Sequence, residues 1–470
     1  MLRAVPEEIQ QRLRQFGQEH VLRWWDRLRD QERQELVDQL ARIDLAQLRD
    51  LYSRRNASIP LPAPEQIQAI GVTRLDPSDQ STRQRGEDAF RRGEVAALVV
   101  AGGQATRLGF DHPKGMFPIG PVSDKTLFQI HAEKVLALSH RYGKGVPLLV
   151  LTSPATDAET QAFFEMQRFF GLAREDVRFF CQGTMPALDW ATGKLLLEAP
   201  GRLFTSPNGH GGTLLALAES GLLEQMEQRG IRQIFYFQVD NPLVKVGAPI
   251  FLGHHLQTGA EVSSKIVRKE EPNDRLGNLV LVDGRCTMIE YSDLPAELAR
   301  QTDDEGRLRI SAGSPAIHIF AVDFLRRLTR KGVQIPFHVA RKKVPYLDEN
   351  GKPVQPDKEN ALKFEMFIFD VLPLAERWAV VETSRREEFV PLKNATGPDS
   401  PAVVRQAISN RAADWLEQAG IAVPRQPNGD SAVALEISPL YALNARELAA
   451  KVPAGLRVDG PLYLNDPATG

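Results

Sequence analysis

Cysteine is scarce in this sequence, which has only Cys181 and Cys286 among its 470 residues. Neither belongs to a Cys-x-x-Cys arrangement, so the sequence excludes a disulfide framework and a cysteine-rich zinc site. Any bound metal ion must therefore be held by oxygen ligands.

A large excess of charge of one sign is also absent. Lys and Arg total 58 against 60 Asp and Glu, a formal net charge of -2, and no basic block forms a surface for nucleic acid. No apolar run reaches membrane-spanning length, and the N-terminal stretch has acidic residues too early for a signal peptide. We expect no nucleic-acid partner, no membrane partner and a cytoplasmic location. The oligomeric state stays open, with a monomer as one option.

Apolar residues, by contrast, are ample for a large core. With 42% hydrophobic side chains in 470 residues, the chain is too long for one average domain. Residues 1–85 predict a helical N-terminal element and a linker, because apolar residues recur at three-to-four spacing up to residue 52 and the proline-rich stretch 59–64 cannot continue a helix. Residues 391–470, which proline and glycine interrupt, predict a small C-terminal domain.

Residues 86–390 alternate short apolar runs with helical stretches. This alternation predicts an α/β domain with a Rossmann-like, mainly parallel mixed sheet and helices on both faces. The expected strands occupy residues 95–100, 147–152, 177–181, 233–239, 262–267 and 279–282. The turn signal Asp283-Gly284 after the last of these predicts an antiparallel hairpin that faces the ligand.

A glycine-rich loop follows the first of these expected strands. Gly102 and Gly103 come directly after the run 95–100, at the edge where open α/β sheets bind ligands. They let backbone amides approach phosphate oxygens closely, and Arg107 and Lys114 add cations that can follow a pyrophosphate. The spacing matches neither the dinucleotide-binding nor the P-loop pattern, so neither a dehydrogenase nor a P-loop NTPase is supported. A tight turn with solvated charges is the structural alternative.

A carboxylate occupies the corresponding edge of another expected strand. The run 233–239 ends at Asp240, which places a hard oxygen ligand where Mg²⁺ could bind with phosphate oxygens and water. An Asx turn that leads into the next segment is the structural alternative.

Several motifs, taken together and in order, resemble one family. They include AGGQATRLGFDHPKGMFPIG, CQGTMPAL, SPNGHGGTLLAL, FQVDNPLVKV, MIEYSDL and EEFVPLKNATG. They are similar to the eukaryotic-type UDP-N-acetylhexosamine (UDP-N-acetylglucosamine) pyrophosphorylases within the UDP-glucose pyrophosphorylase family, and the similarity covers nearly the whole chain before about residue 420. The resemblance implies that residues 86–390 are a nucleotidyltransferase catalytic domain, which transfers a uridylyl group from UTP to a sugar 1-phosphate with Mg²⁺.

The resemblance also assigns roles to individual residues. It implies that catalysis uses Arg107, Lys114 and Lys393, and that Asp240 binds the metal ion. It implies nucleotide contacts from Ala101, Gly102, Gly103, Lys114, Gln182, Gly209, Asp240 and Lys363. It implies sugar contacts from His210, Gly277, Glu290 and Ser314. Without the resemblance, Gln182, Lys363 and Lys393 would be taken for solvated surface residues.

The sequence departs from the family pattern near the expected sugar site. Ser314 stands where the family has Asn after Ala-Gly, and Ile317 replaces another Asn nearby. Ser314 is shorter and has no amide, so the acceptor is either N-acetylglucosamine 1-phosphate, which the family favours, or glucose 1-phosphate or a broader range of sugars. A nucleotide-sugar sensor without turnover is the rival from another class, although the retained phosphate-binding charges argue against it. Ala105 also replaces a family Gly. Alanine fits this position without strain only if its backbone φ is negative.

Overall fold

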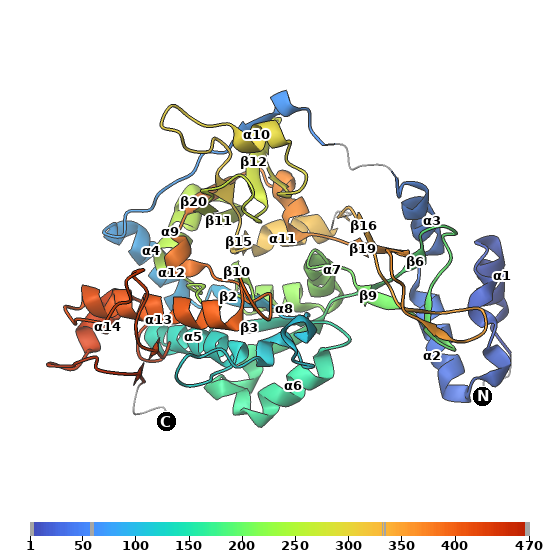
Figure 1. Cartoon of the computed structure of the whole chain (residues 1–470), viewed down its shortest axis with the longest axis horizontal. Helices are drawn as coiled ribbons and strands as arrows, with labels where there is room; N and C mark the ends of the chain where they lie inside the picture. Colours follow the sequence, from blue (N-terminus) through green and yellow to red (C-terminus); the bar gives the residue numbers. More distant parts are fainter. Residues whose placement is uncertain (1–3, 57–60, 331, 333–334, 466–470) are drawn as a thin grey trace. The chain divides into compact units, whose positions relative to one another are not determined.

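A computed structural model describes residues 4–56, 61–330, 332 and 335–465 (Figure 1). The chain divides into two compact units, each built from three separate stretches. The first comprises Met1–Leu61, Gln182–Thr213 and Gln334–Asp370, and the second comprises Pro62–Cys181, Leu214–Val333 and Val371–Gly470. Residues 59 and 60 of the expected linker lie outside the described residues.

These two units differ from the three consecutive segments expected from the sequence. In the first unit, strand β19 (Ala361–Glu365) pairs with β6 (Leu188–Asp189), so stretches far apart in the sequence join the N-terminal helices. The division at residues 85 and 390 into functional domains stays a prediction.

The main sheet of the second unit has 11 strands among the described residues. Four strands run parallel, in the order β10 (Gln233–Gln238), β2 (Val95–Val100), β3 (Leu148–Thr152) and β4 (Val177–Cys181). On the other side of β10, β15 (His318–Ala321) pairs antiparallel with β10 and with β11 (Val262–Arg268). The α/β fold with a mixed sheet confirms the predicted fold class.

The strands beyond β11 complete this sheet. They are β1 (Ile67–Ala69), β12 (Asn278–Val282), β13 (Arg285–Ile289), β14 (Ala312–Gly313) and β20 (Trp378–Glu382). β12 and β13 form the predicted hairpin. Asp283 and Gly284 have φ values of 47° and 74° in its turn, which is the left-handed geometry that an Asp-Gly pair adopts readily.

Helices pack on the second unit's sheet through buried apolar side chains. Helix α5 begins after Thr126, whose hydroxyl accepts a backbone hydrogen bond, and ends at Gly143 in the left-handed region. Its Phe128 shares one buried core with Val99 of β2 and Phe237 of β10. The helices assigned to this unit are α4 (Gln80–Arg91), α5 (Leu127–Tyr142), α6 (Asp157–Met166), α8 (Leu222–Gln228), α9 (Pro249–Thr258), α10 (Ala296–Arg300), α11 (Val322–Arg330), α12 (Arg385–Glu388), α13 (Pro401–Gln418) and α14 (Ala445–Lys451).

The C-terminal part of the second unit has a buried cluster of its own. α13 and α14 pack with the parallel pair β21 (Leu435–Ile437) and β22 (Leu462–Leu464), and the cluster includes Trp415, Leu416 and Leu448. Among the described residues, no helix is both long and apolar enough to cross a membrane.

The first unit combines helices with small antiparallel sheets. Its N-terminal helices are α1 (Glu7–Gln15), α2 (Asp30–Arg42) and α3 (Leu45–Ser53). Besides β6 and β19, its strands are β5 (Thr184–Pro186), β7 (Leu197–Ala199), β8 (Arg202–Leu203), β9 (Thr205–Pro207), β16 (His338–Lys342), β17 (Tyr346–Leu347) and β18 (Pro353–Val354). Leu13, Trp25 and Leu36 share a buried cluster with Leu362 and Phe364 of β19, which explains why these separate stretches fold as one unit.

Candidate active site

The glycine-rich loop begins where β2 ends in the second unit. Ala101 donates its backbone N–H to β3 at 2.8 Å, and the Gly102 carbonyl accepts a 2.7 Å hydrogen bond from the Ser153 hydroxyl. The backbone N–H of Lys114 donates to the Gly103 carbonyl at 3.0 Å. The loop is thus held at both of its ends, which places Lys114 beside its glycines.

A short 3-10 turn, Thr106–Leu108, occupies the middle of the loop. Ala105 precedes it at φ -101°, a backbone geometry open to every residue. Alanine therefore fits without strain where the resembling family has glycine. Arg107 lies on the turn with an exposed side chain, so it presents a cation near the carboxyl end of β2.

Lys114 and Asp240 meet at the edge of the sheet, as expected. Asp240 follows β10, its Oδ2 lies 3.9 Å from Lys114 Nζ, and the two side chains are only 19% and 20% exposed. Leu392 connects them, because its carbonyl accepts from Lys114 Nζ at 3.3 Å while its N–H donates to the Asp240 carbonyl at 2.8 Å. Lys393 comes next in the chain and has an exposed side chain. Leu392 thus links one cation to one carboxylate, and the next residue in the chain adds a second, exposed cation.

The donor set at this edge fits a magnesium ion. Among the described residues, no group of three or more His, Cys, Asp or Glu side chains could hold a metal ion. A full protein cage is not what Mg²⁺ requires, since it commonly binds one or two carboxylates and takes its other ligands from phosphate oxygens and water. The partly exposed carboxylate of Asp240 meets that requirement.

Gly277, Glu290 and Ser314, three of the four residues expected at the sugar, lie together in the second unit, whereas the fourth, His210, belongs to the first unit. The Ser314 N–H donates to the Gly277 carbonyl at 2.9 Å. A Cβ at Gly277 would lie 2.7 Å from Met288 Sδ and 3.8 Å from Glu290 Oε1, so the Met288 side chain packs closely against this glycine. The Ser314 hydroxyl accepts from the Ala316 N–H at 3.2 Å, and Ala316 has a φ of 56°. The serine thus supports a turn in the left-handed region.

Gly209 and His210 belong to a loop in the first unit. Gly209 has a φ of 84°, and a Cβ there would lie 2.4 Å from the Met366 carbonyl oxygen. The neighbouring strand segment holds the loop, since Gly211 N–H donates to Met366 O at 2.8 Å and Ile368 N–H donates to His210 Nδ1 at 3.3 Å. The His210 ring is thus oriented as an acceptor toward backbone, which agrees with a contact residue rather than a general base.

Gln182 and Lys363 are also in the first unit, and neither is a solvated surface residue. The Gln182 side chain is only 7% exposed. Lys363 lies on β19 with its Nζ 5.1 Å from the centre of the Phe204 ring, and its pKa is lowered because the side chain is partly buried. Burial of Gln182 and partial burial of Lys363 argue against a fully solvated position for these two residues, whereas Lys393 is exposed, as the structural alternative expects.

His210 is expected to remain neutral over the working pH range. Burial, with a smaller effect of His338, lowers the pKa of His210 from 6.5 to about 4. Because the folded pKa is depressed, the neutral ring stabilises the fold above pH 6.5, and this contribution is lost as the pH falls from 6.5 towards 4. In His210→Gln we expect a weaker acid dependence of Tm and an unchanged shape of the kcat/KM profile from about pH 6.5 to 9. Loss of an ionisation from that profile would instead identify His210 as a base.

Three supporting residues, Leu392, Lys269 and Asn278, were not foreseen from the sequence. Leu392 acts through its backbone, which no side-chain pattern reveals. Asn278 accepts from Lys269 Nζ at 2.9 Å and donates to the Ile289 carbonyl at 3.2 Å, which fixes the strand start beside Gly277. The only available signal for this pair was Asn278 at the start of an apolar run, because Lys269 lies in the charged stretch 268–271.

The family model for UTP–glucose-1-phosphate uridylyltransferase matches residues 53–407. The chain belongs to this family. Membership confirms the resemblance found in the sequence.

Relatives within the family are similar over most of their length. The human UDP-N-acetylhexosamine pyrophosphorylase-like protein 1 is 36% identical and covers 98% of both chains. The UDP-N-acetylglucosamine pyrophosphorylase of Saccharomyces cerevisiae is 36% identical to this chain. The match covers 87% of this chain and 90% of the yeast protein. The crystal structure of the Trypanosoma brucei uridine diphosphate N-acetylglucosamine pyrophosphorylase is 27% identical, with a TM-score of 0.82, and the match covers 99% of this chain and 100% of that one.

Proposed function

We propose that this chain transfers the uridylyl group of UTP to a sugar 1-phosphate, with N-acetylglucosamine 1-phosphate as the preferred acceptor. The observation that supports the proposal is the contact set of Lys114, Asp240 and Leu392, in which a cation and a carboxylate lie together at the sheet edge where α/β folds bind nucleotides. The names of the relatives supply the nucleotide and the sugar.

The reaction is an in-line displacement at the α-phosphorus of UTP. An oxygen of the sugar phosphate forms the new bond to this phosphorus while the bond to the bridging β-phosphate oxygen breaks, and its electron pair leaves with pyrophosphate. The attacking phosphate is already ionised, so the step needs no general base. Catalysis then consists of positioning and charge neutralisation.

The proposed roles follow the family assignment. Arg107, Lys114 and Lys393 neutralise and orient the phosphates, and Asp240 holds Mg²⁺, which when bound supplies further positive charge to the phosphate oxygens. The nucleotide contacts come from Ala101, Gly102, Gly103, Lys114, Gln182, Gly209, Asp240 and Lys363. The sugar contacts come from His210, Gly277, Glu290 and Ser314.

A pyrophosphate-release assay tests the proposal directly. UTP, ATP, CTP and GTP are each combined with the 1-phosphates of N-acetylglucosamine, N-acetylgalactosamine, glucose and galactose, with Mg²⁺ present. We expect release with UTP and a preference for N-acetylglucosamine 1-phosphate. No release with any UTP pair would overturn the proposal, and UDP-sugar binding without release would favour a sensor.

The acceptor preference has a second candidate, since Ser314 lacks the amide of the family Asn. Glucose 1-phosphate, or a broader range of sugars, is the alternative that this residue favours. We expect Ser314→Asn to raise the ratio of kcat/KM for N-acetylglucosamine 1-phosphate over glucose 1-phosphate by about tenfold, the value of one good hydrogen bond to substrate. Ser314→Ala is the matched control, because it removes the hydroxyl without adding an amide. An unchanged ratio in Ser314→Asn would separate this position from sugar choice.

A further inference from the structure

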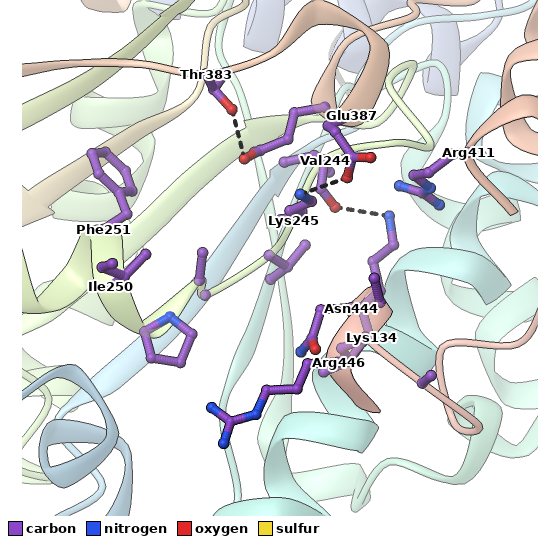
Figure 2. Close-up of a pocket in the computed structure, with 18 of the residues that line it drawn as sticks. Lys134, Val244, Lys245, Ile250, Phe251, Thr383, Glu387, Arg411, Asn444 and Arg446 are labelled. Atoms are coloured by element: carbon purple, nitrogen blue, oxygen red, sulfur yellow. Dashed lines mark hydrogen bonds and ion pairs between the residues drawn. The ribbon is translucent and has the colours of Figure 1, made fainter. Parts of the chain in front are cut away.

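A cavity of about 570 Å³ lies within the second unit, apart from the residues assigned above. Its walls come from α5, α9 and α13 and from the segment that opens α14 (Figure 2). None of the residues proposed to bind nucleotide, sugar or metal lines it. Its volume falls in the range of small-molecule sites.

The lining of this cavity is apolar on one side and cationic on the other. Figure 2 shows Ile250 and Phe251 facing it from one side, with Lys134 and Arg411 on the opposite side. Trp415 adds an aromatic surface, and the Arg411 guanidinium lies 5.2 Å from the centre of its ring. The cavity therefore suits a ligand that has both an apolar body and a polar end.

Each carboxylate of the cavity already pairs with a cation. Glu387 pairs with Lys245 at 2.7 Å, and Glu388 pairs with Lys265 at 2.5 Å. The third, Glu382, pairs with Arg74 and Arg268 outside the lining. Glu387 and Glu388 also act on Arg411, and Glu388 acts on Lys134, at longer range. The two carboxylates are thus shared between the lysines that they pair with and these two further cations.

Lys134 and Arg411 form no ion pair among the described residues. Lys134 is 5% exposed, and its Nζ donates to the carbonyls of Pro242 at 2.6 Å and Val244 at 2.9 Å. Arg411 Nη1 donates to the Leu243 carbonyl at 2.8 Å. Each cation thus keeps further N–H donors for a ligand. Burial, and then the neighbouring Arg411, lower the pKa of Lys134 well below its usual value. An anion between Lys134 and Arg411 would therefore reduce the free-energy cost of burying these two positive charges.

The hydrogen bonds of Lys134 and Arg411 connect the cavity to the segment that follows Asp240. The three carbonyls held by Lys134 and Arg411 belong to residues 242–244, which directly follow Asp240 and Asn241. Leu243 and Val244 are fully buried, so this segment cannot shift independently of its neighbours. A ligand that drew the two cations away from the carbonyls would move the segment that positions Asp240.

We propose that this cavity binds a small organic anion, whose phosphate or carboxylate group lies against Lys134 and Arg411 and whose apolar body lies against Phe251 and Trp415. Occupancy alters turnover through residues 242–244, a consequence that rests on the proposed function. The binding itself does not depend on that function.

Calorimetry on the full chain tests the site with phenyl phosphate and phenylacetate, and with benzyl alcohol as the neutral counterpart. We expect both anions to bind at least tenfold more tightly than benzyl alcohol. Arg411→Gln should weaken anion binding about tenfold, the value of a charge-assisted hydrogen bond. Ile250→Trp should abolish binding by filling the apolar side, and it leaves both cations and their carbonyl contacts in place. Arg457→Gln, which changes an exposed arginine outside the cavity, should bind as the wild type does.

Each outcome bears on one part of the proposal. No binding to the wild type, or unchanged binding to Ile250→Trp, would overturn the site, and equal binding of benzyl alcohol would overturn its anionic character. Phenyl phosphate should change kcat or the KM for UTP in the wild type and in Arg457→Gln but not in Ile250→Trp. Binding with unchanged kinetics would overturn the link to Asp240. A wild type that binds the anions but never releases pyrophosphate would count against the proposed function and leave the site standing.

Discussion

Asp240→Asn should lower kcat by about three orders of magnitude while the protein stays folded. The asparagine keeps the shape of the side chain and the backbone hydrogen bond to Leu392, but it removes the negative charge that we propose holds Mg²⁺. Loss of one preorganised charge at a transferring phosphate typically costs about 10²- to 10³-fold in rate, and loss of the metal ion adds to this. Steady-state pyrophosphate release at varied Mg²⁺ measures the effect, and we expect a higher Mg²⁺ requirement in the variant.

Lys114→Met should show a loss of similar size with no change in the Mg²⁺ requirement. The variant keeps the length of the side chain but loses both its charge near Asp240 and its hydrogen bond to the Leu392 carbonyl. Lys144→Met is the matched control, because Lys144 is exposed in the same unit and lies outside the proposed site. Near-wild-type turnover in Asp240→Asn or Lys114→Met, with Tm unchanged, would refute the assignment of the phosphate site.

The strands of the second unit could be predicted from the sequence because the burial of a strand is visible in its own residues. β2 and β3 are buried along their whole length, so they show as continuous apolar runs. The β12–β13 hairpin could also be predicted from the sequence, because an Asp-Gly pair readily adopts the left-handed backbone of its turn. Neither signal depends on residues distant in the sequence.

The assembly of the first unit had no such local signal. Its core joins the N-terminal helices to β19, more than 300 residues later in the chain, and β19 pairs with β6 from a third stretch. Short strands of two to five residues, without a distinct period, do not reveal their partners. The sequence predicted the helices, and only the structure shows what they pack against.

The candidate site could be predicted only in part from the sequence. Lys114 and Asp240 could be placed at one edge because each follows an expected strand. Leu392 contributes only backbone atoms, so its contact with both Lys114 and Asp240 could not be foreseen. Lys134 and Arg411 look like ordinary helical cations in the sequence, so the cavity could not be foreseen either. Side-chain patterns identify the chemical groups of a site, whereas the backbone contacts that position them need the fold.

Glu388→Gln is expected to destabilise the protein by about 3–5 kcal/mol, the usual cost of breaking a buried ion pair. Glu388 and Lys265 have side chains that are 6% and 3% exposed, and Lys265 Nζ donates to both carboxylate oxygens at 2.7 and 2.5 Å. Removing one charge leaves the other buried without a partner. Urea unfolding of the variant against the wild type, at constant m-value, measures the loss.

The double variant Lys265→Met with Glu388→Leu should recover most of that stability. It replaces both charges by apolar groups of similar size, so no buried charge is left uncompensated, and such exchanges are often neutral or stabilising. The Asn241 amide donates to the backbone carbonyl of Glu388 at 2.7 Å, and this contact does not need the carboxylate. Turnover of the double variant should therefore stay near wild type, because the segment after Asp240 remains held. A double variant that is as unstable as Glu388→Gln would show that the charges themselves, rather than their mutual compensation, stabilise this part of the fold.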